Sequence, residues 1–319
     1  MRNNKGSTKP FTERAIISEI SRILGERLDD DCAYMKLGNT YVALTVDSMP
    51  VSTHVPEGAT PEDIGWHSIA VSLSDLASSG ADPECLLLSI VAPRGKRAVI
   101  PRIIKGAKGC ASHHSTRIAG GDTKEGEELV LTSVGIGRTP RPVTRSGARP
   151  GDSIYVTGAM GGCAAGFLEE DRNIGARSIL RIAPRTALAG LIRSRASACI
   201  DLSDGLVTSL YHLSKASGCA MKVDTDIVPL DARYMALASG LSKKERVRVA
   251  LNFGGDYELL FTSSNRVPAS VKGVRVTRIG MVVRGDGVID EHRRVIQDEG
   301  YENFSDRWIG NELTFRDLT

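Results

Sequence analysis

The sequence predicts a mixed α/β protein with two domains, and three observations support this prediction. At 319 residues, the chain is longer than one ordinary hydrophobic core requires. Short apolar runs of strand length alternate along it with segments of helical period. A segment at 138–152, "RTPRPVTRSGARPGD", combines three prolines with glycine and charge and separates two such halves. We therefore expect a flexible tail at 1–10, one domain at 11–140 and a second at 141–319.

The elements of the first half are predicted by the residues that typically begin and end helices and strands. Thr12 caps the first helix and Gly25 ends it. Thr60 and Asp63 form a capping-box pattern at the start of the next helix, and Asp47 closes the strand between the two helices. The expected elements are a helix at 11–25, a buried strand at 41–47, a helix beginning at Thr60 and ending before Gly80, and a strand at 129–137.

Strands and helices alternate again in the second half. The periodicity of apolar residues changes repeatedly between two and 3.6, which is typical of α/β domains. The expected elements are strands at 153–158, 220–224 and 257–263, a strand that ends at Asp201, a helix around 188–195 and a helix after Gly205.

Charge and composition argue against nucleic acids and membranes as partners. The net charge of +3 is small, and aromatic residues make up only 5% of the chain, so stacking platforms for single strands are not evident. The densest basic stretch, at 94–109, carries apolar residues at helical spacing and is best interpreted as a solvated helix face. No apolar run approaches the ~20 residues of a membrane span. The basic N-terminus is not followed by the apolar segment of a secretory signal.

The six cysteines are scattered, without a C-x-x-C pair or a cluster with histidine. In a chain of this length, they are best interpreted as free thiols in a reducing compartment, so we expect a cytoplasmic protein. A zinc-type site is not expected, and any metal would be a hard cation held by carboxylates.

Aspartates recur where strands end and where turns begin. Crevices in α/β sheets open at strand ends, so carboxylates there are well placed for a ligand. Any single one could instead cap a helix or close a turn. Taken together, oxygen ligands without cysteine or histidine favour Mg²⁺, and Mg²⁺ with many carboxylates favours a polyphosphate substrate. These residues are Asp30 and Asp31 in "LDDDCA", Asp47, Asp75 on an apolar helix stripe, Asp122 in "AGGDTK", and Asp201 and Asp204 in "CIDLSDGL".

A glycine-rich segment at 157–167, "TGAMGGCAAGF", is the one candidate phosphate cradle. It lacks the G-x-x-x-x-G-K-[ST] pattern of a P-loop, and close helix packing explains its glycines equally well.

The order of several motifs resembles the thiamine-monophosphate kinase family, within the superfamily of aminoimidazole-ribonucleotide-synthetase-like proteins. The resemblance covers about residues 12–304. The motifs are "DDCA", "TVDSMP…H", "SLSDLASSGADP", "GGDT", "TRSGARPGD…YVTG", "IDLSDGL", "GGDYELLFT" and "GYENF". It implies a homodimer that forms through the sheet of the N-terminal domain, with a C-terminal α/β domain packed against each. ATP and several Mg²⁺ ions would lie between the domains, and thiamine monophosphate would be the acceptor.

The resemblance also implies roles for individual residues. No side chain is expected to act as a nucleophile or general base, because the transfer would be metal-assisted. Thiamine contacts would come from His54 and Tyr301. Nucleotide contacts would come from Gly120, Gly121, Arg145 and Ser203. The expected metal ligands, some acting through water, are Asp31, Thr45, Asp47, Asp75, Asp122, Asp201 and Asp204.

Two positions depart from the family pattern. Val46 stands where a hydroxylated residue often precedes the metal-binding aspartate, so only a backbone contact could persist there. The family's "GGEDYEL" is shortened to "GGDYEL", which leaves Gly255 where a substrate-contacting glutamate is expected; Asp256 and Glu258 are candidates to replace it.

Other activities remain as alternatives. Selenophosphate synthetases bring a reactive cysteine or its equivalent near the N-terminus, and hydrogenase-maturation carbamoyl dehydratases end in a cysteine. Neither feature is evident here, and aminoimidazole-ribonucleotide synthetases usually show a different acidic motif in place of "GGDT". A nucleotide-binding regulatory protein that has lost catalysis is the alternative from another class.

Overall fold

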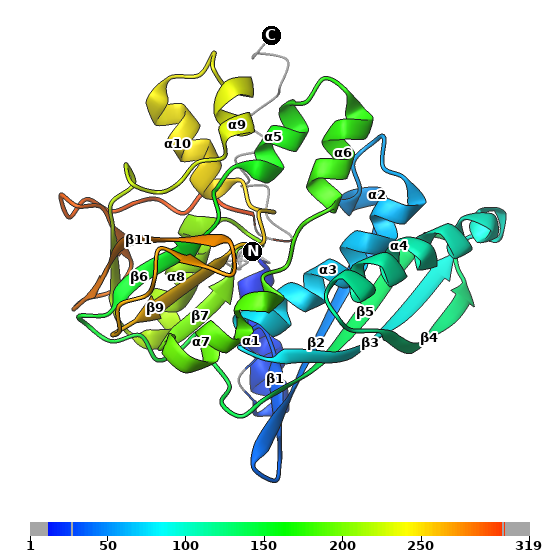
Figure 1. The fold of residues 1–319 in the computed structure, drawn as a ribbon, viewed down its shortest axis with the longest axis horizontal. Coiled ribbons are helices and arrows are strands. Elements are labelled where there is room, and N and C mark those ends of the chain that lie inside the picture. Colours follow the sequence, from blue (N-terminus) through cyan, green and yellow to red (C-terminus); the bar gives the residue numbers. More distant parts are fainter. Residues whose placement is uncertain (1–11, 27, 302, 304–319) are drawn as a thin grey trace, which may run out of the picture.

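The computed structural model describes residues 12–26, 28–301 and 303, so the tail predicted at 1–10 lies outside the described residues. Two β-sheets lie side by side, each with helices packed on it (Figure 1). The first sheet ends at Thr139 and the second begins at Ser153. The chain therefore crosses from one to the other within the proline-rich segment. None of the described helices is both long and apolar enough to span a membrane.

The first sheet has the strand order β1-β2-β5-β3-β4, antiparallel except for the parallel pair of β3 and β4. Along β5, every second residue is buried, because one face of the sheet is covered by α3 and α4 while the other is open. The strands are β1 (Ala33–Leu37), β2 (Thr40–Pro50), β3 (Asp82–Ala92), β4 (Ile118–Glu125) and β5 (Val130–Thr139). The helices are α1 (Glu13–Leu24), α2 (Val51–His54), α3 (Pro61–Ser78), a 3₁₀ turn (Arg94–Val99) and α4 (Ile100–His113).

The predicted helix signals are confirmed. Thr60 and Asp63 form a reciprocal capping box at the start of α3, with Pro61 in the first turn. Thr12 caps α1 through the N–H of Ala15, and Gly25 ends that helix with a φ of 70°. The apolar stripe of α1, however, is not buried in this chain.

Two strand boundaries differ from the predictions. β2 continues for three residues beyond Asp47, because its pairing with β5 extends to Pro50 opposite Val130. Asp122 does not follow a strand but lies within β4, where it pairs with Ser89 of β3. In both cases, backbone pairing with a neighbouring strand continues the element past the aspartate.

The second sheet has the strand order β12-β8-β11-β6-β9-β7, with β10 paired to β11. The predicted strands at 153–158, 220–224 and 257–263 and the strand into Asp201 are all present. The strands are β6 (Ser153–Thr157), β7 (Ala198–Asp201), β8 (Ala220–Val223), β9 (Leu259–Ser263), β10 (Ser270–Val271), β11 (Val274–Val283) and β12 (Val288–Ile289). The helices are α5 (Gly162–Leu168), α6 (Arg172–Leu180), a 3₁₀ turn (Thr186–Leu188), α7 (Ala189–Arg195), α8 (Leu206–Ser217), α9 (Ala232–Leu237) and α10 (Lys243–Asn252).

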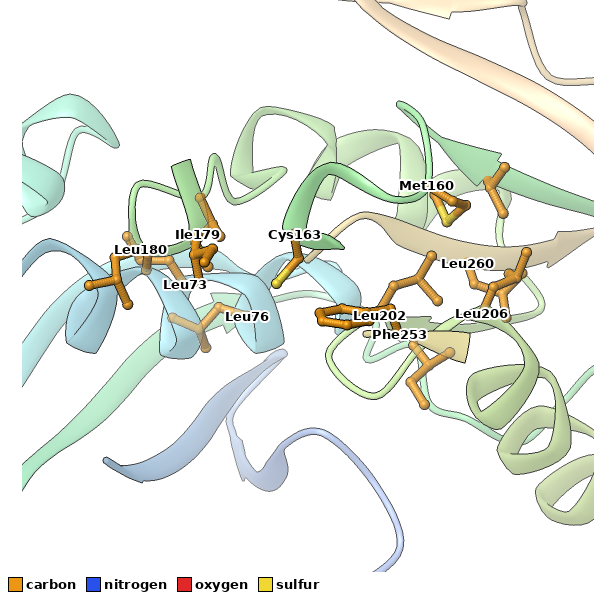
Figure 2. Close-up of a cluster of buried hydrophobic side chains, with 14 of the residues drawn as sticks. Leu73, Leu76, Met160, Cys163, Ile179, Leu180, Leu202, Leu206, Phe253 and Leu260 are labelled. Carbon is orange, nitrogen blue, oxygen red and sulfur yellow. The ribbon is translucent and has the colours of Figure 1, made fainter. Parts of the chain in front are cut away.

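A continuous hydrophobic core joins the two sheets and fixes the position of α3. Leu73 and Leu76 of α3 belong to the same buried cluster as Leu202, Leu260 and Phe253 of the second half (Figure 2). Leu73 and Leu76 are fully buried. Because α3 is packed on both sides, its polar residues are held at a fixed place between the sheets.

Candidate active site

A cavity of about 700 Å³ lies between the two halves, a size typical of small-molecule sites. Its walls come from the turn before β1, from β2, α2 and α3, and from the segments that follow β7 and α10. Most of the polar residues expected from the sequence line this cavity. They are Asp31, Thr45, Asp47, His54, Asp75, Arg145, Asp201, Ser203, Asp204 and Tyr301.

Three carboxylates converge at the centre of this cavity. One oxygen each of Asp31, Asp75 and Asp201 lies within 4.8 Å of the others. They come from three separate elements: the turn before β1, the helix α3 and the end of β7. Their convergence therefore depends on the docking of the two halves against each other.

Serine hydroxyls on α3 hold these carboxylates in place. Ser74 donates a hydrogen bond of 2.7 Å to Asp201, and Ser72 donates one of 2.6 Å to Asp47. Ser78 donates to Asp31. One helix thus positions acidic side chains from both sheets, and the bond from Ser74 links the halves directly.

The threonine before Val46 belongs to the same arrangement. Thr45 and Asp47 alternate with Val46 along β2, so they share the face that is turned toward α3. Thr45 donates a hydrogen bond of 2.5 Å to Asp75. The side chain of Val46 carries no hydroxyl and lies on the opposite face of β2, where it is 66% exposed.

Burial and mutual repulsion raise the carboxyl pKa values. Burial, and then the charge of Asp31, raise the pKa of Asp201 to about 8. Burial raises the pKa of Asp75 well above its ordinary value, and Asp47 and Asp201 add to the effect. The pKa of Asp204 rises to about 6 through burial and the nearby Glu13. Without added cations, this cluster carries more negative charge than its surroundings stabilise.

Arg145 brings a positive charge into contact with the cluster. Its guanidinium lies 2.6 Å from Asp31, and its backbone N–H donates to Asp30 over 3.2 Å. Burial and the charge of Asp31 raise the pKa of Asp30 to about 7. Arg145 lies in the segment between the sheets, so the connection itself supplies a charged group to the site.

Asp204, which follows β7, contacts the C-terminal segment. Tyr301 lines the cavity there, its N–H donates to the carbonyl of Asp204 over 3.3 Å, and its hydroxyl donates to Asn303. His54 lines the same cavity from α2, where its Nδ1 lies 2.7 Å from the hydroxyl of Thr53. Both expected thiamine contacts therefore border the cavity that holds the carboxylates.

Gly120, Gly121 and Asp122 do not join this arrangement within one chain. They lie on β4, at the edge of the first sheet, and do not line the cavity. The Asp122 side chain is 57% exposed and lies 3.8 Å from Lys124.

The glycine-rich segment is occupied by a carboxylate of the protein itself. Asp256 accepts hydrogen bonds from the N–H groups of Gly161 and Cys163, over 2.8 and 3.0 Å. A Cβ at Gly161, where φ is 95°, would lie 2.9 Å from the ring of Tyr234. Of the two interpretations left open by the sequence, the geometry favours close packing over a phosphate cradle.

Neither candidate replacement for the family glutamate points into the cavity. The carboxylate of Asp256 accepts hydrogen bonds from the N–H groups of Gly161 and Cys163. Glu258 is buried against Arg185 and accepts a hydrogen bond of 2.5 Å from Thr157. At Gly255, φ is 77° and a Cβ would lie 2.5 Å from the sulfur of Cys163, so the position suits glycine alone.

The donor set fits a hard divalent cation. The converging ligand atoms are carboxylate oxygens, which Mg²⁺ prefers. Asp31, Asp75 and Asp201 would hold such an ion, and Asp47, Thr45 and Asp204 lie around them in the same cavity. The raised pKa values of Asp75 and Asp201 are consistent with a cation site. Buried carboxylates that repel one another are stabilised either by binding protons, which raises their pKa values, or by binding a cation.

Residues 29–139 match the family described as AIR synthase related protein, N-terminal domain. Thiamine-monophosphate kinases of Salmonella typhimurium and Escherichia coli K12 are each 33% identical over 312 residues, covering 89% of this chain and 95% of the relative. The chain belongs to the thiamine-monophosphate kinase family. The kinase of Halobacterium salinarum is 34% identical and covers 86% of the chain.

Solved structures agree with this assignment. A thiamine-monophosphate kinase, AaThiL, complexed with AMPPCP and TMP superimposes with a TM-score of 0.84 at 28% identity, over 92% of this chain and 97% of that one. The Aquifex aeolicus thiamine-monophosphate kinase gives 0.78 at 27% identity. The hydrogenase maturation protein HypE of E. coli, at 22% identity and a TM-score of 0.63, shares the fold.

Sequence reasoning missed the groups that support the carboxylates. Ser72, Ser74 and Ser78 were not among the expected site residues, although each donates to a carboxylate. Their signal was present as a run of serines on an otherwise apolar helix in "SLSDLASS". His67, which lines the cavity one turn before Val71, was also missed.

Proposed function

We propose that this chain transfers the γ-phosphoryl group of ATP directly to the phosphate of thiamine monophosphate, with several Mg²⁺ ions, to form thiamine diphosphate. The observation that carries the proposal is the convergence of Asp31, Asp75 and Asp201 in a cavity between the sheets. Membership of the kinase family and the similarity to a structure with an ATP analogue and TMP support it.

The acceptor requires no strong general base. The second pKa of a phosphate monoester is about 6, so the attacking oxygen is already anionic near neutral pH. The main obstacle is repulsion between two phosphates, on the order of 4 kcal/mol for each charge pair at 4 Å and intermediate dielectric. When bound, Mg²⁺ would neutralise these charges and those that develop on the transferred group.

The residues of the chain position the reactants and balance charge. Asp31, Asp75 and Asp201 would hold the metal, and the serines of α3 keep their carboxylates oriented. Arg145 forms an ion pair with Asp31 and would place a permanent positive charge beside the phosphates. Ser203 borders the cavity and would contact the nucleotide. His54 and Tyr301 would contact the thiamine moiety.

We also propose a homodimer through the open face of the first sheet. Many of the alternate residues of β2, β3 and β5 on that face are apolar: Val42, Leu44, Val46, Leu87, Val130, Val134 and Ile136. Ser48, Thr132 and Ser89, which pair across the three strands, add a polar strip to the same face. Val46 is 66% exposed and Leu87 is 36% exposed. A contiguous apolar face of this kind is typical of a subunit interface.

The glycines and aspartate of β4 are explained by the same dimer. Because Gly120, Gly121 and Asp122 lie outside the cavity of their own chain, we propose that they serve the site of the second copy. Mixing Asp75→Asn with Asp122→Asn subunits tests this, since a mixed dimer then regains one intact site. Activity that stays at the level of the two separate variants contradicts the idea.

Release of ADP from ATP, measured with and without thiamine monophosphate, tests the function itself. Chromatography should detect thiamine diphosphate in proportion to ADP, and ADP release should depend on Mg²⁺. Direct transfer predicts inversion of configuration at a chiral γ-phosphorus, whereas retention indicates a phosphorylated intermediate. ADP release that does not depend on thiamine monophosphate would refute the proposal and favour another reaction. We expect the enzyme to act in the cytoplasm, where its six free thiols persist.

A further inference from the structure

His67 extends the line of α3 residues that begins at Asp75. His67, Val71 and Asp75 recur every four residues, and all three line the cavity. Eight residues of helix separate His67 from Asp75 by about 12 Å along the axis, at 1.5 Å per residue. The cavity wall therefore runs from the carboxylate cluster, past an apolar valine, to an imidazole.

The contacts of the His67 ring determine which nitrogen carries the proton. Nδ1 lies 3.2 Å from the carbonyl oxygen of Leu180. Because a carbonyl oxygen only accepts hydrogen bonds, Nδ1 must be the protonated nitrogen. The ring is held further by an edge-to-face contact with Tyr257, with centroids 5.6 Å apart and planes at 86°. In the neutral ring, Nε2 is then an acceptor, and no described residue forms a hydrogen bond with it.

The surroundings keep this imidazole neutral. Burial lowers the pKa of His67 to about 4, and the nearby His54 acts in the same direction. At neutral pH, Nε2 therefore presents a lone pair to any ligand in the cavity. A lone pair repels a phosphate oxygen but accepts a hydrogen bond from an amino group.

We infer that Nε2 of His67 accepts a hydrogen bond from the amino group of the acceptor's aminopyrimidine ring and so selects the substrate. The inference rests on the proposed function, which places the acceptor phosphate at the carboxylate cluster. In thiamine monophosphate, two rings separate the phosphate from the amino group, and the length of α3 between Asp75 and His67 matches an extended molecule of this kind. Val71, between them, provides an apolar wall for the rings.

Two substitutions separate the two nitrogens. In His67→Asn, the amide N–H₂ can replace Nδ1 and keep the bond to Leu180, while the acceptor at the Nε2 position is lost. In His67→Gln, the longer amide can present an oxygen near the Nε2 position. The matched control is His292→Asn, because this histidine is on the surface, with 68% of its side chain exposed.

The assay compares thiamine monophosphate with oxythiamine monophosphate, in which an oxygen replaces the amino group. We expect the wild type to prefer the amino compound by roughly ten-fold or more in kcat/KM. In the analogue, the oxygen that replaces the amino group is a hydrogen-bond acceptor and cannot donate to Nε2. His67→Asn should raise KM for thiamine monophosphate roughly ten-fold, leave KM for ATP unchanged and bring the preference close to one. His67→Gln should recover part of the preference, and His292→Asn should behave as wild type.

An unchanged preference in folded His67→Asn overturns the inference, as does an equal loss of kcat for both substrates. If the wild type shows no turnover of thiamine monophosphate, the proposed function fails. Calorimetric titration with the two monophosphates then measures the preference directly, and equal binding, or none, overturns the inference as well.

Discussion

Asp75→Asn should change stability and activity in opposite directions. The substitution keeps the shape of the side chain, and its amide oxygen can still accept the hydrogen bond from Thr45. It removes one negative charge from a cluster in which three carboxylate oxygens lie within 4.8 Å of one another. Repulsion between two full charges at this separation is about 3.5 kcal/mol at an effective dielectric constant of 20.

The gain in stability will be smaller than the full repulsion. The raised pKa of Asp75, which burial and then Asp47 cause, shows that the carboxyl avoids part of the repulsion by holding a proton. We therefore expect the metal-free variant to be more stable than the wild type by roughly 1–3 kcal/mol at pH 8. In thermal melts with EDTA, the variant should unfold at the higher temperature.

Addition of Mg²⁺ and an ATP analogue should reverse this order. Binding at 100 times the dissociation constant stabilises the native state by about 2.7 kcal/mol, and the variant should lose most of that gain. Turnover in the ADP-release assay should fall by roughly a thousand-fold or more, since metal binding and charge neutralisation are both impaired. The exposed Asp286 supplies the control variant, Asp286→Asn. Near-normal turnover of Asp75→Asn at millimolar Mg²⁺, or a lower melting temperature in EDTA, would refute the reasoning.

Three further predictions concern the acceptor, the interface and pH. Tyr301→Ala should raise KM for thiamine monophosphate roughly ten-fold, through loss of ring stacking on a cation, and His54→Ala should affect the same substrate; an effect on KM for ATP alone would place the acceptor pocket elsewhere. Light scattering at micromolar concentration should find a dimer, and Val46→Asp on the open face should shift it toward monomer; a monomeric wild type contradicts the interface. His67 has a folded-state pKa of about 4, below the ordinary 6.5, so its neutral form stabilises the fold above pH 6.5 and this stability is lost as pH falls toward 4. Denaturant unfolding should show that the free energy of unfolding of His67→Asn rises by roughly 1–2 kcal/mol relative to that of the wild type between pH 7 and 4. This is less than the full shift implies, because the ring is half-buried and borders the cavity. Parallel pH profiles of the two proteins would contradict a neutral ring at this position.

The sequence alone determined several of the elements and the identity of most polar residues in the site. Capping residues such as Thr60 and terminating glycines such as Gly25 act within one or two turns, so they are visible without tertiary structure. Periodicity likewise placed β7 and located Asp201 at its end. The order of the acidic motifs was sufficient to indicate the family.

Tertiary structure decided which of these residues meet. Asp31, Asp75 and Asp201 converge because the core around Leu73 and Leu76 fixes α3 between the two sheets. β2 continues past Asp47 because it pairs with β5, a contact between segments far apart in the chain. Asp122 remains on an edge strand outside the cavity. Local signals report the conformation of a few neighbouring residues, whereas the position of a side chain in a site depends on packing between distant segments, and no short stretch of sequence encodes that packing.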